Sequence, residues 1–252
     1  SSDLKRTIDS VLQQSHDNIE ILIIDDGSTD GTKNIILDYE DEYDSITGYF
    51  HSKNLGQGFS RNTGVSNANG SIISYVDSDD VIHKDHIKIV SNELKSSNDN
   101  IGGILTSYQM TGDRHKKIRY SNETLDLCEI DSIHGNSPAH FTGLSIKAQI
   151  IKNIGLHDIK MVRNADIDFL IQILKTYNIL KLDKILFDKY YNNDDRISKN
   201  WDKIIQGNQR FLDKHENTLN SSQKAHKYYQ TGKAYLNKNN INKANSCFSK
   251  ST

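Results

Sequence analysis

Two short apolar runs that each end in a group of aspartates constrain the fold of this chain more than any other feature. The runs are residues 20–24 (EILII) and 71–76 (SIISYV), and the carboxylates that follow them are Asp25, Asp26, Asp77, Asp79 and Asp80. Continuous apolar runs of this length are typical of strands covered on both faces. Because α/β proteins bind ligands beyond the carboxyl ends of their strands, we expect the two acidic groups to share a crevice. Grouped carboxylates there indicate either a divalent cation or, for Asp77-Ser78-Asp79, an acidic turn that caps the following helix.

Helix and strand patterns alternate along most of the chain. Apolar side chains at helical spacing predict helices at residues 2–14, about 35–43, 58–68, 84–94, 145–154 and 167–177. Apolar runs predict strands at residues 20–24, 46–51, 71–76, 101–108 and 179–191. The alternation indicates the α/β class, with a mostly parallel sheet flanked by helices. Residues 110–140 are polar, and their pattern assigns no element.

The last fifty residues differ from the rest. Residues 199–252 are rich in Asn, Lys and Gln and predict a C-terminal helical extension that follows a main domain over residues 1–198. Five residues fall at the spacing of a tetratricopeptide-like helix pair: Tyr228, Gly232, Tyr235, Ala244 and Phe248. The extension is therefore a partial repeat of that kind, which would engage a protein partner or self-associate, or a closing helical hairpin packed on the main domain.

Composition excludes several classes of function. The net charge of −2 over 252 residues offers no basic surface for nucleic acid, so no nucleic-acid partner is expected. No apolar stretch approaches the roughly 18 residues that cross a bilayer. Cys128 and Cys247 lie far apart and are interpreted as reduced thiols, which favours a cytoplasmic location.

Three motifs in register resemble those of a known family. The segments IEILIIDDGSTDGT and NLGQGFSRNTGVSNANGSIISYVDSDD contain an Asp-Asp-Gly-Ser turn, an Arg-Asn pair that opens a helix, and an Asp-x-Asp signature. In this order they resemble the donor half of family 2 glycosyltransferases, which have the Rossmann-like GT-A fold. The resemblance covers residues 2–95 strongly and 140–200 weakly. It implies a donor half at about 1–108 and an acceptor half at about 109–198.

The resemblance assigns roles to residues of the donor half. Asp26 matches the carboxylate that accepts from the donor's pyrimidine base, and Asp25 beside it is either a second donor-site acid or a structural turn acid. Arg61 matches an arginine near the nucleotide, and Asn54 is a further lining residue. Two aspartates match the metal site: Asp77 at the ribose and the metal, and Asp79 as the direct metal ligand. Asp80 is interpreted as a cap of the following helix.

The resemblance also implies a catalytic base in the second half. Relatives place this base at an aspartate that opens a helix, and Asp166 takes that position in the stretch NADIDFL, with Asp168 as the alternative. Members commonly have a Glu before this Asp, where this chain has Ala165. A carboxylate here would remove the acceptor's proton. The alternative for both residues is a structural carboxylate favoured by the dipole at the start of a helix. Residues in two polar segments are additional candidates near the acceptor or the diphosphate: His134, His140, Asn192, Asp194 and Arg196.

The resemblance implies an inverting glycosyltransferase that depends on Mn²⁺ or Mg²⁺ and uses a nucleotide sugar, with a UDP-sugar favoured. The acceptor would be a glycan, a glycoprotein or a lipid-linked sugar, and the enzyme would be cytoplasmic or peripheral at the inner face of the membrane. A catalytically inactive nucleotide-sugar or glycan-binding module with a protein-recruiting tail is the alternative. A phospho-acceptor receiver module is disfavoured, because it leaves Arg61 and Asp166 without a role. Family members begin with a strand before the first helix. Since the chain starts at that helix, we expect a longer natural polypeptide or an incomplete donor pocket.

Overall fold

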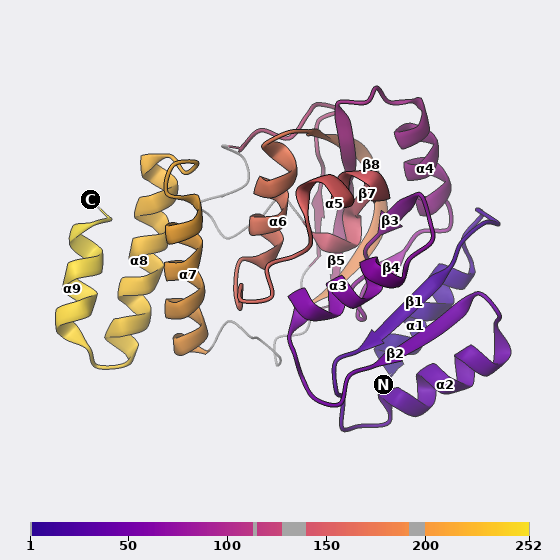
Figure 1. Cartoon of the computed structure of the whole chain (residues 1–252), viewed down its shortest axis with the longest axis horizontal. Helices are drawn as coiled ribbons and strands as arrows, with labels where there is room; N and C mark the ends of the chain where they lie inside the picture. The colour runs from indigo at the N-terminus through magenta and orange to yellow at the C-terminus, as the bar shows by residue number, and fades with distance from the viewer. Residues whose placement is uncertain (1, 113–114, 128–139, 192–199, 252) are drawn as a thin grey trace.

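The computed structural model of the chain describes residues 2–112, 115–127, 140–191 and 200–251. Within these residues, two sheets and their flanking helices form one part of the molecule. Three C-terminal helices lie side by side next to this part (Figure 1). The predicted α/β class is confirmed. The helical character expected of the C-terminal segment is present as well.

The first sheet consists of two parallel strands. Strand β1 (Ile21–Asp25) pairs with β2 (Ile46–Phe50), and helix α2 (Thr32–Glu42) connects them. The connection is a helix because parallel neighbours need a crossover. Helices α1 (Ser2–Leu12) and α2 contribute to one apolar cluster with both strands: Leu4, Ile8, Ile21, Ile36 and Ile46. The sheet thus holds the Asp-Asp-Gly-Ser turn at the end of β1.

The second sheet is mixed, so the expectation of a mostly parallel sheet is corrected. Its strands β3 (Ile72–Ser74), β7 (Leu144–Lys147), β5 (Ile101–Gly112), β8 (Asn178–Tyr191) and β4 (Val81–Ile82) lie in that order. Strand β5 runs parallel to β8 and antiparallel to β7, and β3 and β4 pair antiparallel with their neighbours. Strand β6 (Lys116–Ile118) also pairs antiparallel with β5. The antiparallel pairs β3–β7, β4–β8 and β5–β7 join strands far apart in the sequence, so the helix–strand alternation does not indicate their direction.

The segment after residue 143 differs from its prediction for a tertiary reason. A single helix was expected over residues 145–154, whereas the structure has strand β7 followed by helix α5 (Ala148–Ile154). Strand β7 pairs with both β3 and β5. Pairing on two sides outweighs the weak helical preference of four residues. A short 3-10 helix, η2 (Phe141–Gly143), leads into this strand.

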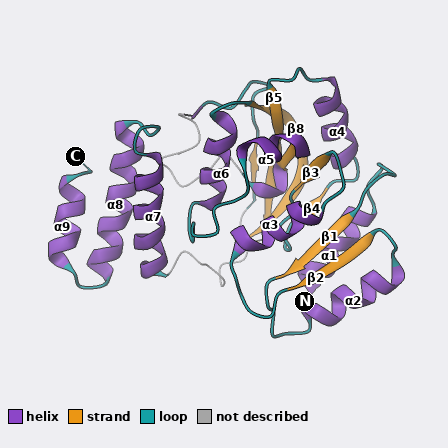
Figure 2. Ribbon diagram, in the orientation of Figure 1, coloured by secondary structure: helices purple, strands orange, loops and turns teal. Residues whose placement is uncertain are grey.

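Three further helices flank the two sheets, one against the first sheet and two against the second (Figure 2). Helix α3 (Gln57–Asn67) follows the loop over residues 51–56, α4 (His86–Ser96) follows β4, and α6 (Ala165–Leu174) precedes β8. One face of α6 enters the main core with Phe169 and Leu170, which are both 0% exposed. Because that core also contains Phe141 of η2, the N-terminal turn of α6 lies close to the segment that opens β7.

The C-terminal extension is a sequence of three helices, α7 (Trp201–His215), α8 (Ser221–Asn237) and α9 (Ile241–Ser249). Helices α8 and α9 pack against each other, which fits both a partial repeat and a closing helical hairpin. A Cβ atom at Gly232 of α8 would lie 2.6 Å from the ring of Phe248 on α9, so only glycine permits this close approach. Among the helices that the structure describes, none is both long and apolar enough to cross a membrane.

Candidate active site

The acidic turn after β3 is fixed by contacts from distant segments. The backbone N–H of Asp80 donates to the carbonyl of Asp77 at 3.1 Å, which closes the turn. The backbone N–H of Asp77 donates to Thr142 Oγ1, and that hydroxyl donates to Asp80 Oδ2. The Thr7 hydroxyl of α1 donates to the carbonyl of Asp80 at 2.7 Å. The turn is therefore held by α1 and η2, and its side chains have defined positions.

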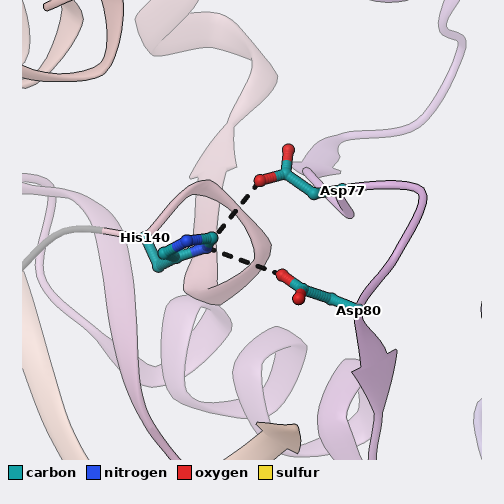
Figure 3. Close-up of side chains that lie close together, drawn as sticks. All are labelled: Asp77, Asp80 and His140. Carbon is teal, nitrogen blue, oxygen red and sulfur yellow. Dashed lines mark ion pairs between the residues drawn. The ribbon is translucent and has the colours of Figure 1, made fainter. Parts of the chain in front are cut away.

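Asp77, Asp80 and His140 lie together beside this turn (Figure 3). Their ligating atoms lie within 4.8 Å of one another. His140 Nδ1 is 3.8 Å from Asp77 Oδ2 and 3.6 Å from Asp80 Oδ2. Among the described residues this nitrogen has no hydrogen-bond partner, although it is buried. Two carboxylates and an imidazole at these distances form a group that can hold a metal ion.

The electrostatics of the turn also favour a cation. The pKa of the Asp80 carboxyl is raised to about 7, mainly by burial. The neighbouring charges of Asp77 and Asp79 contribute to this rise, and the hydrogen bond from Thr142 opposes it. Burial and Asp77 likewise raise the pKa of Asp79. Burial lowers the pKa of Lys189 on β8, and the three aspartates oppose that change. The carboxylates thus repel one another and gain from any positive charge placed among them.

Arg61 of α3 connects the acidic turn to the start of α6. Its Nη1 donates to Asp166 Oδ1 at 2.7 Å, and its Nη2 lies 3.8 Å from Asp77 Oδ1. The guanidinium carbon lies 3.7 Å from the centre of the Phe141 ring, which fixes its plane. Burial raises the pKa of Asp166 and the charge of Asp77 adds to the rise, while Arg61 opposes it. The Asp166 side chain remains 42% exposed, so a bound molecule can still reach this carboxyl.

The two candidate bases occupy different environments. Asp168 is 1% exposed and points away from Arg61, toward α7, where His215 Nε2 lies 2.7 Å from its Oδ1. Burial works to raise the pKa of Asp168, but hydrogen bonds from His215 and Lys214 hold it below its ordinary value. A buried carboxylate with this many partners is a structural anchor. The geometry favours Asp166 as the residue that faces a substrate.

Asp25 and Asp26, the two aspartates predicted to lie near the donor's pyrimidine base, form hydrogen bonds to backbone groups of nearby loops. Asp26 accepts hydrogen bonds from the backbone N–H groups of Leu55 at 2.8 Å and Gly56 at 2.7 Å, and His51 Nδ1 lies 2.8 Å away. Burial works to raise the pKa of Asp26, but these contacts hold it below its ordinary value. Asp25 is buried and accepts from the backbone N–H of Ser28 at 3.0 Å, the turn role that was one of its two interpretations.

The two acidic groups follow strands of different sheets, Asp25 and Asp26 at the end of β1 and Asp77, Asp79 and Asp80 after β3. Their convergence in one crevice stays a prediction. Asn54 is exposed in the loop that Asp26 holds. Gly27 allows the turn after β1 to pack closely on the loop that contains Lys53. A Cβ at Gly27 would lie 2.5 Å from the backbone of Lys53, and the φ of +74° also favours glycine. The roles of Asp25, Asp26 and Asn54 at a donor therefore stay predictions.

The second half of the Arg-Asn pair has a structural role. Asn62 accepts from the backbone N–H of His157 and donates to the carbonyl of the same residue, both at 2.9 Å. This two-point contact places α3 against the segment that leads to α6. Adjacent residues of α3 thus have different roles. Arg61 lies in the site, whereas Asn62 holds α3 against the segment that leads to α6.

Sequence reasoning missed several residues of the site. Asp80 was interpreted as a helix cap, but it accepts a hydrogen bond from Thr142 and belongs to the candidate metal-binding group. Asp79, the predicted direct metal ligand, lies outside that group. Phe141 and Lys189 carried no local signal, because an apolar residue and a lysine are common anywhere. His140 had been named only as an acceptor candidate. His134, Asn192, Asp194 and Arg196 lie outside the described residues, as does Cys128.

Comparison with solved structures defines the class of this fold. TarS 1-349 of Staphylococcus aureus in complex with UDP-GlcNAc has a TM-score of 0.66 at 16% identity, and the match covers 99% of this chain and 87% of that chain. The mannosyltransferase PcManGT of Pyrobaculum calidifontis, in complex with GDP-Man and Mn²⁺, has a TM-score of 0.63 at 13% identity and covers 98% of this chain and 70% of that chain. The fold is therefore that of GT-A-like glycosyltransferases.

Comparison with families then places the chain. The model of glycosyl transferase family 2 matches residues 1–155, more than half of the chain, and the chain belongs to this family. An uncharacterized glycosyltransferase of Rickettsia typhi is 29% identical over 183 residues, which is 70% of this chain and 56% of that protein. The glycosyltransferase GlyA of Streptococcus pneumoniae is 35% identical over 91 residues, which is 36% of this chain and 13% of that protein. The chain thus spans about half of the first relative's length and less of the second's.

Proposed function

We propose that the chain transfers a sugar from a nucleotide sugar, with a UDP-sugar as the favoured donor, to a hydroxyl group of an acceptor. The acceptor oxygen attacks the anomeric carbon, and its proton passes to the carboxylate of Asp166. The bond between the anomeric carbon and the diphosphate oxygen breaks, and its electron pair leaves with the nucleoside diphosphate. A single displacement of this kind inverts the anomeric centre.

One observation carries the proposal. Arg61 lies between two carboxylates, Asp166 and Asp77, and Arg61 and Asp166 are 105 positions apart in the sequence. The Arg61 side chain is 11% exposed, so its charge is largely withdrawn from water. An isolated surface ion pair contributes little to stability and needs no such convergence. A partly exposed cluster of one arginine and two carboxylates can bind an anionic ligand through the arginine. One of its carboxylates can then accept a proton beside that ligand.

The contacts of Arg61 indicate its role in the free site and in the site with a bound donor. A diphosphate offers an arginine more acceptor oxygens than one carboxylate does. We expect a bound donor to draw Arg61 away from Asp166. The carboxylate, whose pKa burial raises, would then be available as a base of adequate strength.

A divalent ion is part of the proposal. The buried Nδ1 of His140 lacks a partner among the described residues, and two carboxylates lie within reach of the same point, so the residues fit Mn²⁺ or Mg²⁺. The sequence motif predicts Asp77 and Asp79 as ligands, and the geometry adds Asp80 and His140 as candidates. When bound, such an ion offsets the charge that develops on the leaving diphosphate.

The proposed donor is a nucleoside diphosphate sugar, and the proposed acceptor is a cell-surface glycan. TarS is solved with UDP-GlcNAc, and PcManGT is solved with GDP-Man and Mn²⁺, so a nucleoside diphosphate sugar is the common donor chemistry. Asp26, with Asp25 and Asn54 nearby, is proposed to line the nucleotide side. A putative teichuronic acid biosynthesis glycosyltransferase of Bacillus subtilis, 38% identical over 85 residues, or 34% of each chain, favours a cell-surface glycan as the acceptor. A glycoprotein or lipid-linked acceptor, reached from the cytoplasm or the inner face of the membrane, belongs to the same proposal.

Titration with UDP, with and without Mn²⁺, followed by hydrolysis assays with UDP-GlcNAc and GDP-mannose, tests this function. We expect metal-dependent UDP binding and slow release of UDP from the donor. Asp79→Ala and Asp80→Ala, measured side by side, identify the metal ligand, because only loss of a ligand removes the Mn²⁺ dependence. Failure of UDP to bind in the presence of Mn²⁺, together with failure to hydrolyse either donor, would refute the proposal.

A binding module without turnover is the second candidate. The specific observation in its favour is the 2.7 Å contact between Arg61 and Asp166, which would keep the base occupied if no ligand displaced it. Ala165 replaces the Glu that the resemblance implies before the base. UDP binding with Mn²⁺ but no hydrolysis of either donor, and no transfer to an added glycan, would support the module.

A further inference from the structure

Helix α7 of the C-terminal extension contacts the chain on both sides of Asp166. Asn164 lies two residues before Asp166, and Asp168 lies two residues after it. Both side chains are hydrogen bonded to α7, from positions 44 and 47 residues later in the sequence. The extension therefore borders the proposed base, although none of its described side chains lies in the site itself.

Asp168 is the first of these contacts. His215 Nε2 lies 2.7 Å from Asp168 Oδ1, and Lys214 Nζ donates to Oδ2 at 2.9 Å. His215 is 1% exposed, and Gln172 of α6 completes the set with a 2.8 Å hydrogen bond. A buried carboxylate that loses one of its partners is strongly destabilised. This contact therefore restrains the first turn of α6 more firmly than an exposed ion pair would.

Asn164 is the second contact. It adopts the left-handed conformation, with φ of 61°, at the position that begins α6. Its Nδ2 donates to Asn208 Oδ1 at 3.1 Å, and Lys227 Nζ donates to its Oδ1 at 3.2 Å. Asn208 is 0% exposed. A Cβ at Gly207 would lie 2.5 Å from Arg163 Cβ, so the backbone of α7 packs directly on the segment that precedes α6.

We propose that His215 and Asn208 of α7 are positioning residues for Asp166. They hold the backbone on both sides of Asp166 and thereby direct its carboxylate toward Arg61 and Asp77. This inference rests on the proposed role of Asp166 as the base. A carboxylate that receives a proton must be placed within hydrogen-bond reach of the acceptor, and a displacement of about 1 Å can cost 100-fold in rate. The helical extension is then part of the catalytic apparatus.

Variants of His215 test the proposal in the full chain. His215→Leu removes the hydrogen bond to Asp168, whereas His215→Gln keeps an N–H donor at a similar reach. We expect His215→Leu to lower kcat for UDP release from UDP-GlcNAc about 10–100-fold, with the donor KM and the Kd for UDP and Mn²⁺ changed by less than about 2-fold. His215→Gln should recover most of kcat. Ala244→Gly in α9 is the control, because it weakens the extension at a buried site remote from α6 and should leave kcat unchanged.

Hydrogen exchange gives a readout that does not need turnover. The amides of residues 165–170 should exchange faster in His215→Leu than in the wild type, and should not do so in Ala244→Gly. Asn208→Ala should have the same effect, which keeps the test valid if His215→Leu does not fold. Unchanged exchange and unchanged kcat in a folded variant would overturn the positioning role. A wild type that binds and hydrolyses no donor refutes the proposed function instead, and the exchange result still decides on the contact.

Discussion

Asp80 illustrates how a side chain acquires a role that its position in the sequence does not indicate. It precedes a helix, which favours the interpretation as a cap, yet its carboxylate accepts from Thr142, 62 positions later. Helix α4 instead begins after Asp85, whose side chain makes no capping hydrogen bond. The contact with Thr142 depends on the tertiary position of η2, which local pattern does not determine. Burial and two neighbouring carboxylates then make the charged form of Asp80 unfavourable.

A pH-dependent gain in stability is expected for Asp80→Asn. Burial raises the pKa of Asp80 to about 7 in the folded protein, above the ordinary value of about 3.9 for an unfolded chain. Between these values the folded state binds more protons, so this group's contribution to stability is full at low pH and is lost as pH rises toward 7. Relative to the wild type, Asp80→Asn should gain about 1–3 kcal/mol in the free energy of unfolding between pH 4.5 and pH 7.5 without metal.

Urea denaturation at the two pH values measures this difference. Asp99→Asn, at an exposed position before β5, is the matched control and should show no such gain. Comparison with the wild type removes the effect of His86, whose pKa burial lowers to about 4, because both proteins contain it. A variant that gains nothing at pH 7.5 would show that Asp80 is not held in the environment described.

Asp166→Asn should separate binding from catalysis. The amide keeps the size of the side chain and a hydrogen-bond contact for a neighbour, but it cannot take the acceptor's proton. We expect turnover to fall by about 10²–10⁴-fold while the Kd for UDP and Mn²⁺ changes little. Steady-state kinetics and calorimetric titration check the two halves of this prediction. Equal losses in binding and turnover would assign Asp166 to the donor site and leave the base elsewhere.

At the scale of elements, the sequence predicts what depends on local pattern. Helices α1 to α4 and strands β1, β2 and β5 appear where periodicity places them, since each buries one apolar face or both. Strand β7 and the antiparallel pairings depend on partners far away in the sequence. The site shows the same division. Asp77, Arg61 and Asp166, which the resemblance names, lie together, while Asp80 and His140 join them only through the tertiary path of η2.

Gly232→Ala should disrupt the α8–α9 pair. Alanine normally favours a helix over glycine by about 1 kcal/mol. Here the added Cβ would lie 2.6 Å from the Phe248 ring, so overpacking should outweigh that preference and lower the free energy of unfolding by about 1–3 kcal/mol. Thermal unfolding measures the loss. The double variant Gly232→Ala/Phe248→Leu should recover part of it, and an increase in Tm for the single variant would contradict this packing.

At the scale of the whole molecule, the extension and the main domain share one apolar core. Phe211 and Leu212 of α7 lie in the same buried cluster as Phe169 and Leu170 of α6. Charged contacts lie beside it, since Arg210 donates to both oxygens of Asp158 at 2.7 and 2.9 Å. We therefore infer that the boundary near residue 199 separates two segments of sequence that depend on each other for folding.

A single unfolding transition is the consequence. Trp201, at the start of α7, is the one tryptophan of the chain, so its fluorescence reports on the extension, while far-ultraviolet circular dichroism reports on all helices and strands. The two signals should give the same Tm, because neither part keeps its core when the other unfolds. UDP with Mn²⁺ binds only the folded state in this proposal, and at 100 times its Kd it should raise the stability seen by both signals by about 2.7 kcal/mol. If the ligand raised one transition and left the tryptophan signal unmoved, the extension would be an independent module, and α7 could not position Asp166.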